Sequence, residues 1–420
     1  GSIARVGNDA GFDRLINSYS YGGLFRNDMA WFQGDAVRKN PNLKPETTIS
    51  KEIGAEVRLL DGRLTADVTY YDKYTRDQIV ESELSYLSNY QRVIINSGKI
   101  SNKGWEISVS GVPVKVKNFE WKTIFNWSKN NSMVESLPEG IDKIQIGSGV
   151  YNVKSYAEVG KPYGAIYAKT FKRDAEGYIL CQLDGSPKEG QDYEYLGCVQ
   201  ADWRGGWNNV FRLGNFSFSV MFDFQKGGKF FSQTSIQSSV DGQSVKSLEG
   251  RDADFFSRKI LGESDEERYG FMRPQNANTP TANGQIYPDW GRPKGVVLPN
   301  CRYDEDVEGL AGQQVLGYCT PERYWMHYTS RDISRFIYDA SYVKLREITV
   351  SYDLPKKWLR KTPFQTFRVA AVGRNIATLF ANTPHGLDPQ ATSTTGNAQG
   401  FERGFNLPSA TYGFDIKVSF

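Results

Sequence analysis

The chain has 420 residues, with 51 Lys and Arg against 48 Asp and Glu, so its net charge of +3 leaves no surplus of cations for binding nucleic acid. No stretch approaches the roughly 18 to 20 consecutive apolar residues of a spanning helix. Aromatic residues make up 14% of the chain and glycine occurs 41 times, which favours strands and turns.

The predicted elements are strands in which apolar and polar residues alternate. In 216–224, for example, Phe218 and Val220 share a face opposite Ser219. In 342–354 the alternation changes near Arg346 and Glu347, which predicts either a bulge or the edge of the apolar band. The expected strands are 49–60, 63–75, 102–111, 119–127, 205–213, 216–224, 342–354, 366–377 and 411–420, with residues 1–7 as the end of a tenth.

Short turns and long loops alternate between these strands. Asp61-Gly62 and Gly214-Asn215 are typical of two-residue hairpin turns that need positive φ. The other short connections lie near 115 and at 354–365, and the long loops are 8–48, 76–101, 131–201, 227–339 and 379–409. All long loops therefore leave the sheet on one side, as in an outer-membrane β-barrel with periplasmic turns and extracellular loops.

The predicted fold class is all-β, an antiparallel transmembrane barrel, because closure pairs every backbone group within hydrocarbon. The last strand then runs toward the periplasm, where Phe420 is a candidate recognition mark for the machinery that inserts barrels. A soluble glycan-binding β-sandwich also alternates apolar and polar residues. Loops of this length fit a compact sandwich poorly.

Eight segments in order resemble the barrel of the SusC/RagA-like TonB-dependent transporters. The first is "NPNLKPETTISKEIGAEVRLLDGRLTADVTYYDKYTRDQIV", and "INSGKISNKGWEISVSG", "FNWSKNNSMVESL", "EVGKPYGAIYAKTF", "DASYVKLREITVSYDLP", "VAAVGRNIATL", "GLDPQATS" and the aromatic-capped last strand follow. The resemblance implies a barrel of about 22 strands with a plugged lumen. Residues 1–420 would supply about ten C-terminal strands, and the plug would lie outside this chain.

The resemblance further implies active import across the outer membrane of a Gram-negative bacterium. A SusD-like surface lipoprotein would cap the loops, the TonB complex would act through the absent N-terminal part, and transporter and lipoprotein could pair into dimers. The cargo would be an oligosaccharide or an oligopeptide. The alternative is an outer-membrane structural or adhesion protein with a small closed barrel of its own.

The sequence offers no catalytic constellation, so we expect no enzyme. It contains no G-x-x-x-x-G-K-[ST], H-E-x-x-H or G-x-S-x-G motif. Its two histidines, His327 and His385, are expected to be loop residues.

Cysteines, acidic residues and aromatics in the loops are the remaining candidates. An oxidising exterior favours disulfides, and proximity in sequence favours Cys181 with Cys198 and Cys301 with Cys319 among three connectivities. The alternative is that the four cysteines are free thiols. The spacing does not suit zinc. Asp304, Glu305, Asp306 and Glu308 form either a solvated loop or a calcium site. The aromatics expected to be exposed, as ligand contacts or as packing, are Trp31, Tyr151, Tyr156, Trp290, Tyr324, Trp325 and Phe405.

Overall fold

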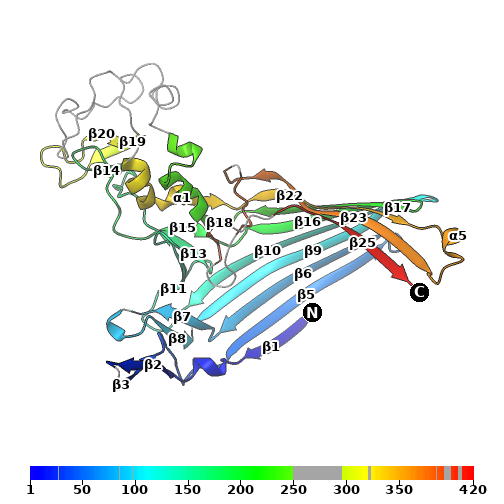
Figure 1. Ribbon diagram of the computed structural model, residues 1–420, viewed down its shortest axis with the longest axis horizontal. Coiled ribbons are helices and arrows are strands. Elements are labelled where there is room, and N and C mark those ends of the chain that lie inside the picture. The colour runs from blue at the N-terminus through cyan, green and yellow to red at the C-terminus, as the bar shows by residue number, and fades with distance from the viewer. Residues whose placement is uncertain are drawn as a thin grey trace, which may run out of the picture.

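The chain folds as a ten-stranded antiparallel sheet, with smaller sheets in the connections at one end (Figure 1). This computed structural model describes residues 1–26, 28–84, 86–96, 98–248, 296–319, 323–384, 386–391, 399–404 and 409–420. In spatial order the large sheet consists of β1 (Ser2–Asn8), β5 (Glu46–Leu59), β6 (Leu64–Arg76), β9 (Lys99–Val116), β10 (Phe119–Ser136), β16 (Trp203–Leu213), β17 (Phe216–Lys226), β22 (Tyr342–Asp353), β23 (Thr366–Ala381) and β25 (Thr411–Ser419). The ten predicted strands are thus confirmed, and residues 1–7 fall almost wholly within β1.

The long connections contain structure of their own. A hairpin is formed by β2 (Tyr19–Phe25) and β3 (Met29–Gly34). One small sheet contains β4 (Val37–Arg38), β8 (Arg92–Asn96) and β7 (Ile79–Glu83), and a second contains β11 (Lys143–Ser148), β12 (Lys154–Glu158), β13 (Ala165–Ala168) and β15 (Glu194–Cys198). A third contains β14 (Ile179–Cys181), β19 (Val296–Tyr303) and β20 (Gln314–Cys319), and a fourth contains β21 (Ile337–Asp339), β18 (Lys229–Ser232) and β24 (Phe401–Glu402). The helices are α1 (Gln233–Val240) and α5 (Lys356–Leu359), with short helical turns η1 (Phe12–Arg14), η2 (Tyr86–Ser88), η3 (Val245–Leu248), η5 (Tyr324–Tyr328), η6 (Thr329–Arg331) and η7 (Ile333–Phe336). Among the described residues, no helix is long and apolar enough to cross a membrane.

The strand register gives the large sheet one apolar and one polar face. An apolar row crosses seven strands through directly paired residues, namely Val57, Ala66, Val109, Phe125, Trp207, Phe222 and Leu345. The row one residue away crosses the same strands and is polar apart from one glycine, and it contains Glu56, Asp67, Ser108, Asn126, Gly206, Asp223 and Lys344. Side chains of successive strand residues point to opposite faces, so the alternation in the sequence becomes an apolar outer wall and a polar inner wall.

The polar atoms on the apolar wall are paired by tryptophans. Trp121 Nε1 donates to Asn209 Oδ1 at 3.0 Å, and Trp207 Nε1 donates to Thr123 Oγ1 at 2.9 Å, each across adjacent strands. An unpaired polar group in hydrocarbon is costly. The indole of Trp121 therefore satisfies the side-chain carbonyl oxygen of Asn209 on this face.

Trp121→Phe is expected to destabilise the sheet by about 1 to 3 kcal/mol, because Asn209 Oδ1 would lose its donor. The matched control is Trp127→Phe on the same strand and face, since the indole of Trp127 makes no hydrogen bond with any described residue. Urea titration in lipid vesicles, followed by the electrophoretic mobility of folded and unfolded protein, compares the two. Equal losses would show that ring packing, and not the hydrogen bond, stabilises this site.

The predicted bulge at Arg346 is confirmed. Leu345 and Glu347 pair with Phe222 and Met221 on β17, which leaves Arg346 without an opposite residue. The register with β23 shifts at the same place. The extra residue turns the Arg346 side chain toward the inner wall, where it reaches Asp223.

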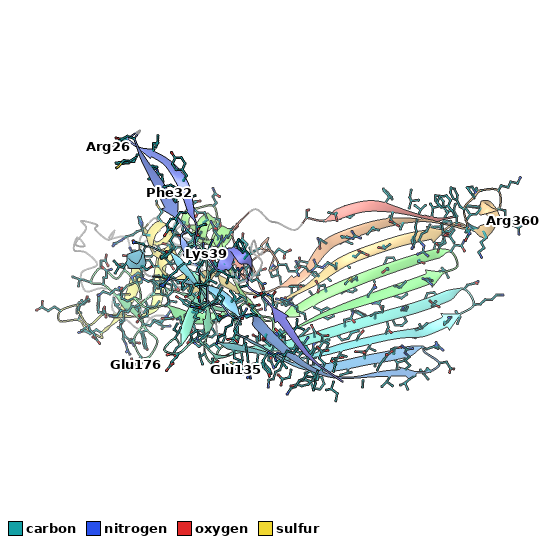
Figure 2. All side chains as sticks on the ribbon, turned by 90° about the horizontal axis from the view of Figure 1, so that it is seen from below. Arg26, Phe32, Lys39, Glu135, Glu176 and Arg360 are labelled. Atoms are coloured by element: carbon teal, nitrogen blue, oxygen red, sulfur yellow. The ribbon has the colours of Figure 1, made fainter. Side chains whose placement is uncertain are left out.

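The four short connections lie at one end of the strands, and the long ones gather at the other (Figures 1 and 2). Gly214-Asn215 forms the predicted two-residue turn between Leu213 and Phe216, with Gly214 at φ 57°. The prediction for Asp61-Gly62 is wrong in length: four residues, 60–63, connect β5 to β6, and the first three have positive φ. Leu59 already pairs with Leu64, so Leu60 and Arg63 complete the turn.

Buried apolar cores lie in the long connections and where these meet the ends of β9 and β10. One cluster contains Val153, Ile166, Ala168, Phe231, Ile236, Ile333, Phe336 and Phe401; another contains Val80, Ile100, Val134, Ile144, Ile146 and Ala157. Both combine segments that are distant in the sequence. The loops therefore form a packed layer over one end of the sheet.

Candidate functional site

The predicted aromatic contacts that lie among the described residues do not form one site. Trp31 lies in the β2–β3 hairpin, whereas Tyr151 packs at the edge of the core around Phe231, where its hydroxyl donates to Gln237. Burial raises the pKa of Tyr151. Trp290, Phe405 and His385 lie outside the described residues.

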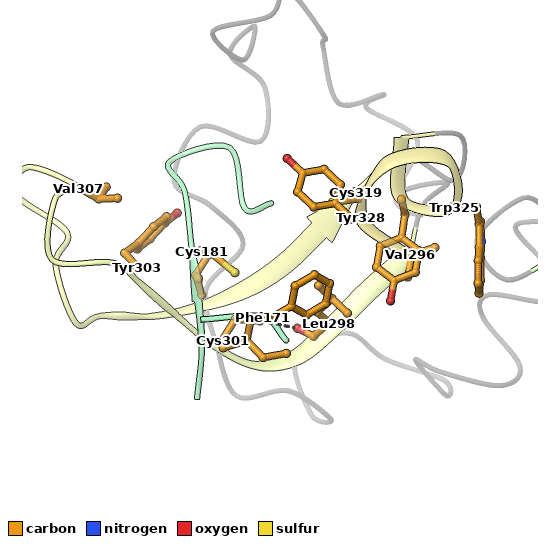
Figure 3. Packing of buried hydrophobic residues seen from close by; sticks show 13 residues of the cluster. Phe171, Cys181, Val296, Leu298, Cys301, Tyr303, Val307, Cys319, Trp325 and Tyr328 are labelled. Carbon is orange, nitrogen blue, oxygen red and sulfur yellow. Dashed lines mark hydrogen bonds between the residues drawn. The ribbon is translucent and has the colours of Figure 1, made fainter. Parts of the chain in front are cut away.

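Tyr324 and Trp325 are buried, so the prediction that they are exposed is wrong. Their exposed fractions are 0% and 1%, and their rings meet edge to face with centroids 5.2 Å apart. They belong to a core with Phe171, Val296 and Leu298 (Figure 3). Here they stabilise the fold of the loop and offer no ring face to a ligand.

The predicted disulfides are not formed. Cys181, Cys198 and Cys319 are free thiols, which excludes both Cys181 with Cys198 and Cys301 with Cys319. Cys198 lies on β15, while the other three lie on β14, β19 and β20 in the buried core of Figure 3. The prediction from proximity in sequence is wrong because strand pairing, and not loop length, decides which cysteines lie close together. Burial raises the pKa of Cys319 to about 12, so this thiol stays protonated.

Two of the four acidic residues after Cys301, Asp304 and Asp306, form ion pairs with lysines. Asp304 is 2% exposed and accepts from Lys172 Nζ at 2.9 Å and from Lys188 Nζ at 2.7 Å, and Lys188 also contacts Asp306. Burial alone would raise the pKa of Asp304, but these hydrogen bonds lower it to about 2. Among the described residues, no group of three or more His, Cys, Asp or Glu could hold a metal ion. The structure therefore favours ion pairs over the calcium alternative.

Phe420 lies at the end of the sheet where the short turns are. Its ring meets Phe364 edge to face, with centroids 5.3 Å apart. Phe364 also contacts Phe367, whose partner on β25 is Val418. The last residue thus completes an aromatic cluster at this rim.

A hydrogen-bonded network of polar side chains on the inner wall is a candidate site. Asp223 on β17 accepts from Tyr342 Oη at 3.2 Å and from Arg346 Nε at 3.1 Å. Lys344 lies between these two residues on β22, and its Nζ contacts Asp388 Oδ1 at 2.5 Å and Oδ2 at 2.6 Å. Only 6% of the Lys344 side chain is exposed.

Gln390 connects the two halves of this network. Its Oε1 accepts from Lys344 at 3.0 Å and from Arg346 at 2.6 Å, and its Nε2 donates to Tyr342 Oη at 2.6 Å. Asp388 and Gln390 belong to the connection that follows β23. The network therefore fastens the segment 386–391 to the inner wall of the sheet.

Next to this network the inner wall contains an open hollow of about 520 Å³. Its lining includes Asp67, Glu106, Asn126, Arg204 and Asp223, from five adjacent strands. The charged and amide side chains of this lining suit water and hydrophilic solutes.

Tyrosines and lysines form a ladder across the small sheet in the third long connection. Tyr167 lies between Tyr156 and Tyr195, with ring centroids 5.1 and 5.6 Å away. Lys143 Nζ is 3.6 Å from the Tyr167 ring centre, and Lys161 Nζ is 4.5 Å from that of Tyr195. Burial lowers the pKa of Lys143. Tyr195 is exposed, so this end of the ladder can stack on a ligand or a partner.

The hairpin of β2 and β3 projects from the other loops (Figure 2). Nearly every residue of its two strands is exposed, and Trp31 remains 45% exposed although its ring lies across Gly22, where an added Cβ would clash at 2.4 Å. The large apolar side chains exposed on it are Tyr19, Tyr21, Leu24, Phe25, Met29, Trp31 and Phe32. An isolated two-stranded hairpin is marginally stable in water, and an exposed apolar surface of this kind marks an interaction site.

Sequence reasoning missed the inner-wall network and, apart from Tyr156, the tyrosine ladder. Lys344 carries a usable signal, since it is a cation at an inward position of a strand that neighbours Asp223. The ladder carries none, because its strands have only four to six residues and no extended alternation.

Comparison with known proteins agrees with this geometry. A family model described as TonB dependent receptor-like, beta-barrel, matches residues 7–376. TonB-dependent receptor P3 of Formosa agariphila is 25% identical over 395 residues, which cover 89% of this chain and 33% of that receptor. TonB-dependent receptor SusC of Bacteroides thetaiotaomicron is 29% identical over 104 residues, which are 24% of this chain and 10% of SusC.

Solved structures show the same fold. The RagAB peptide transporter matches with a TM-score of 0.62 and 16% identity, over 100% of this chain and 40% of that one. The RagAB peptide importer in its closed-closed state matches with a TM-score of 0.63 and 17% identity over the same shares. This chain thus spans between a third and two fifths of the length of P3 and of the RagAB chains.

Proposed function

This chain belongs to the TonB dependent receptor-like β-barrel family, and from that premise we propose that it forms part of the wall of an active importer for a large hydrophilic nutrient. Members of this family are outer-membrane transporters and not enzymes. The observation that carries the proposal is the two-faced sheet, whose apolar outer row and polar inner row run continuously across seven strands. Such a wall separates lipid from an aqueous lumen.

We propose that residues 1–420 form ten strands of a larger barrel. In the described structure β1 and β25 each pair on one side only. A spanning sheet must pair both edges, so further strands of the same barrel are expected beside β1 and β25. This open sheet argues against a self-contained small barrel for adhesion, because ten strands here do not close. Phe420, at the periplasmic rim, remains our candidate for the recognition mark of barrel insertion.

We propose an oligosaccharide or an oligopeptide as the cargo. The likeness to SusC and to RagAB supports an importer of this kind, and RagAB is itself a peptide transporter. The polar hollow and the exposed end of the tyrosine ladder at Tyr195 would provide contacts for either cargo. Energy would come through the TonB complex and a plug outside residues 1–420.

We propose that a SusD-like surface lipoprotein covers the β2–β3 hairpin. The hairpin lies at the loop end, hence on the extracellular side, and its apolar side chains need a partner surface. A lipoprotein lid would bury them and leave the lumen open below. The dimer of two such pairs remains part of this proposal.

Uptake measurements test the proposed import. Deleting the gene should abolish accumulation of one class of labelled substrate, oligopeptides or oligosaccharides. A protonophore should have the same effect in the parent strain, because transport requires the proton motive force. Unchanged uptake of both classes after deletion would contradict the proposal.

Replacing two aromatic residues of the hairpin by aspartate tests the lipoprotein contact. Tyr21→Asp with Phe32→Asp, a pair whose rings meet at 5.9 Å, should reduce the lipoprotein recovered with tagged transporter at least about tenfold, since two desolvated charges oppose burial. Val245→Asp, at an exposed apolar residue of another loop, is the control. Full recovery of the lipoprotein with the double variant would exclude the hairpin as its docking surface.

A further inference from the structure

The connection between β22 and β23 differs from the other short turns. Twelve residues separate Asp353 from Thr366, and they include α5. The other three turns contain two to four residues. Because this connection lies at the short-turn end, where Arg360 marks it in Figure 2, it faces the periplasm in the orientation given above.

This turn carries four cations that pair with no carboxylate among the described residues. Lys356, Lys357, Arg360 and Lys361 are all exposed, and no Asp or Glu lies between Asp353 and Thr366. Within the described ranges none of the four makes an ion pair, and the adjacent Asp353 is held by Arg368 Nε at 2.7 Å and Nη2 at 2.8 Å. The turn is therefore a compact patch of positive charge.

Apolar groups place this patch at the edge of the bilayer. Leu359 is buried and anchors α5, while Trp358 is 60% exposed. Close by, Phe364 contacts Phe367 and Phe420, and Phe367 shares the outer face with Val418. Tryptophan prefers the boundary between hydrocarbon and headgroups. The cations thus lie at the depth of the phosphate groups of the periplasmic leaflet.

We propose that the turn 354–365 is a binding site for anionic phospholipid headgroups, with Trp358 inserted at the boundary and the four cations around the phosphates. Arg360 can donate two parallel N–H groups to one phosphate, and the lysines act as point charges. The proposal rests on the membrane orientation of the proposed function and does not depend on cargo or lipoprotein. A polymer of the periplasmic cell wall would also offer negative charge, but it would not draw an exposed indole into a bilayer.

Quenching of Trp358 by brominated lipids tests this site. The full transporter is placed in nanodiscs of phosphatidylcholine and phosphatidylglycerol in equal amounts, with bromine on the chains of one lipid or the other. The quenched signal that disappears in Trp358→Phe belongs to Trp358. One cation near an anionic surface favours the anionic lipid about fivefold, so bromine on phosphatidylglycerol should quench Trp358 at least about twofold more than bromine on phosphatidylcholine, and high salt should reduce the difference.

The charge variant combines Lys356→Gln, Lys357→Gln, Arg360→Gln and Lys361→Gln, and Lys117→Gln on the turn between β9 and β10 is the control. The preference should vanish in the charge variant and persist in the control. Equal quenching by the two lipids in the unmodified protein would overturn the proposal, as would a preference that survives the charge variant. No quenching by either lipid, with binding of isolated peptidoglycan, would assign the turn to the cell wall. None of these outcomes depends on import, so failure of the proposed function remains distinguishable.

Discussion

Lys344→Met is expected to release the segment 386–391 from the inner wall, with a loss of about 3 to 5 kcal/mol in the free energy that holds it there. The side chain of Lys344 is nearly buried, and both oxygens of Asp388 contact its Nζ. Removal of the cation leaves the Asp388 carboxylate without its counter-charge, and a desolvated unpaired charge is unfavourable. The segment can avoid this cost only by moving into water.

Native-state hydrogen exchange of the amides in 386–391 measures this opening directly. A second variant, Lys344→Met with Asp388→Leu, should recover part of the protection, because two apolar side chains replace the ion pair without leaving a charge. Arg374→Gln is the control, since the Arg374–Glu347 pair lies on an exposed part of the same wall and should contribute at most about 1 kcal/mol. Unchanged protection in Lys344→Met would mean that Gln390 and Arg346 suffice to hold the segment.

Val220→Arg is expected to destabilise the protein by about 2 to 4 kcal/mol, and Ser219→Arg by much less. Val220 lies on the outer face, where it pairs with Asn209 and Ile348 near the middle of β17. An arginine there must enter hydrocarbon or distort the bilayer. Ser219 points to the polar face, where a long cation can reach water.

Urea titration in lipid vesicles compares the two variants on one strand, so that strand propensity and depth are matched. Phe216→Arg, at the rim of the same outer face, should cost about 0 to 1 kcal/mol for its charge, because the penalty falls toward the interface. It also loses a ring contact with Tyr352 at 4.6 Å. If Ser219→Arg were the more damaging variant, the assignment of inner and outer faces would be reversed.

The strands could be predicted from sequence because the bilayer imposes one repeating constraint on them. A residue such as Phe218 must be apolar and its neighbour Ser219 is free to be polar, so the period of two is preserved over ten strands. The same regularity made the bulge at Arg346 visible as a break. The length of the turn at Asp61 could not be predicted in this way, because the sequence does not specify where strand pairing stops.

The loops could not be predicted in the same way, because their cores combine segments from several connections. Tyr324 and Trp325 resemble exposed binding aromatics in sequence, but Val296 and Leu298 from another segment cover them. The predicted cysteine pairs are wrong for the same reason. Lys344 and Asp388 are 44 positions apart, and their contact depends on how the connection after β23 folds back onto the inner wall.

The unpaired edges of β1 and β25 have a consequence for any preparation of this chain by itself. Each edge presents a row of amide N–H and carbonyl groups beside an apolar face, and such an edge is a template for a strand of another molecule. Copies of the ten-stranded unit would therefore add to one another edge to edge and grow into open ribbons. In the larger barrel that we propose, neighbouring strands would cover both edges and would also keep this sheet from polymerising.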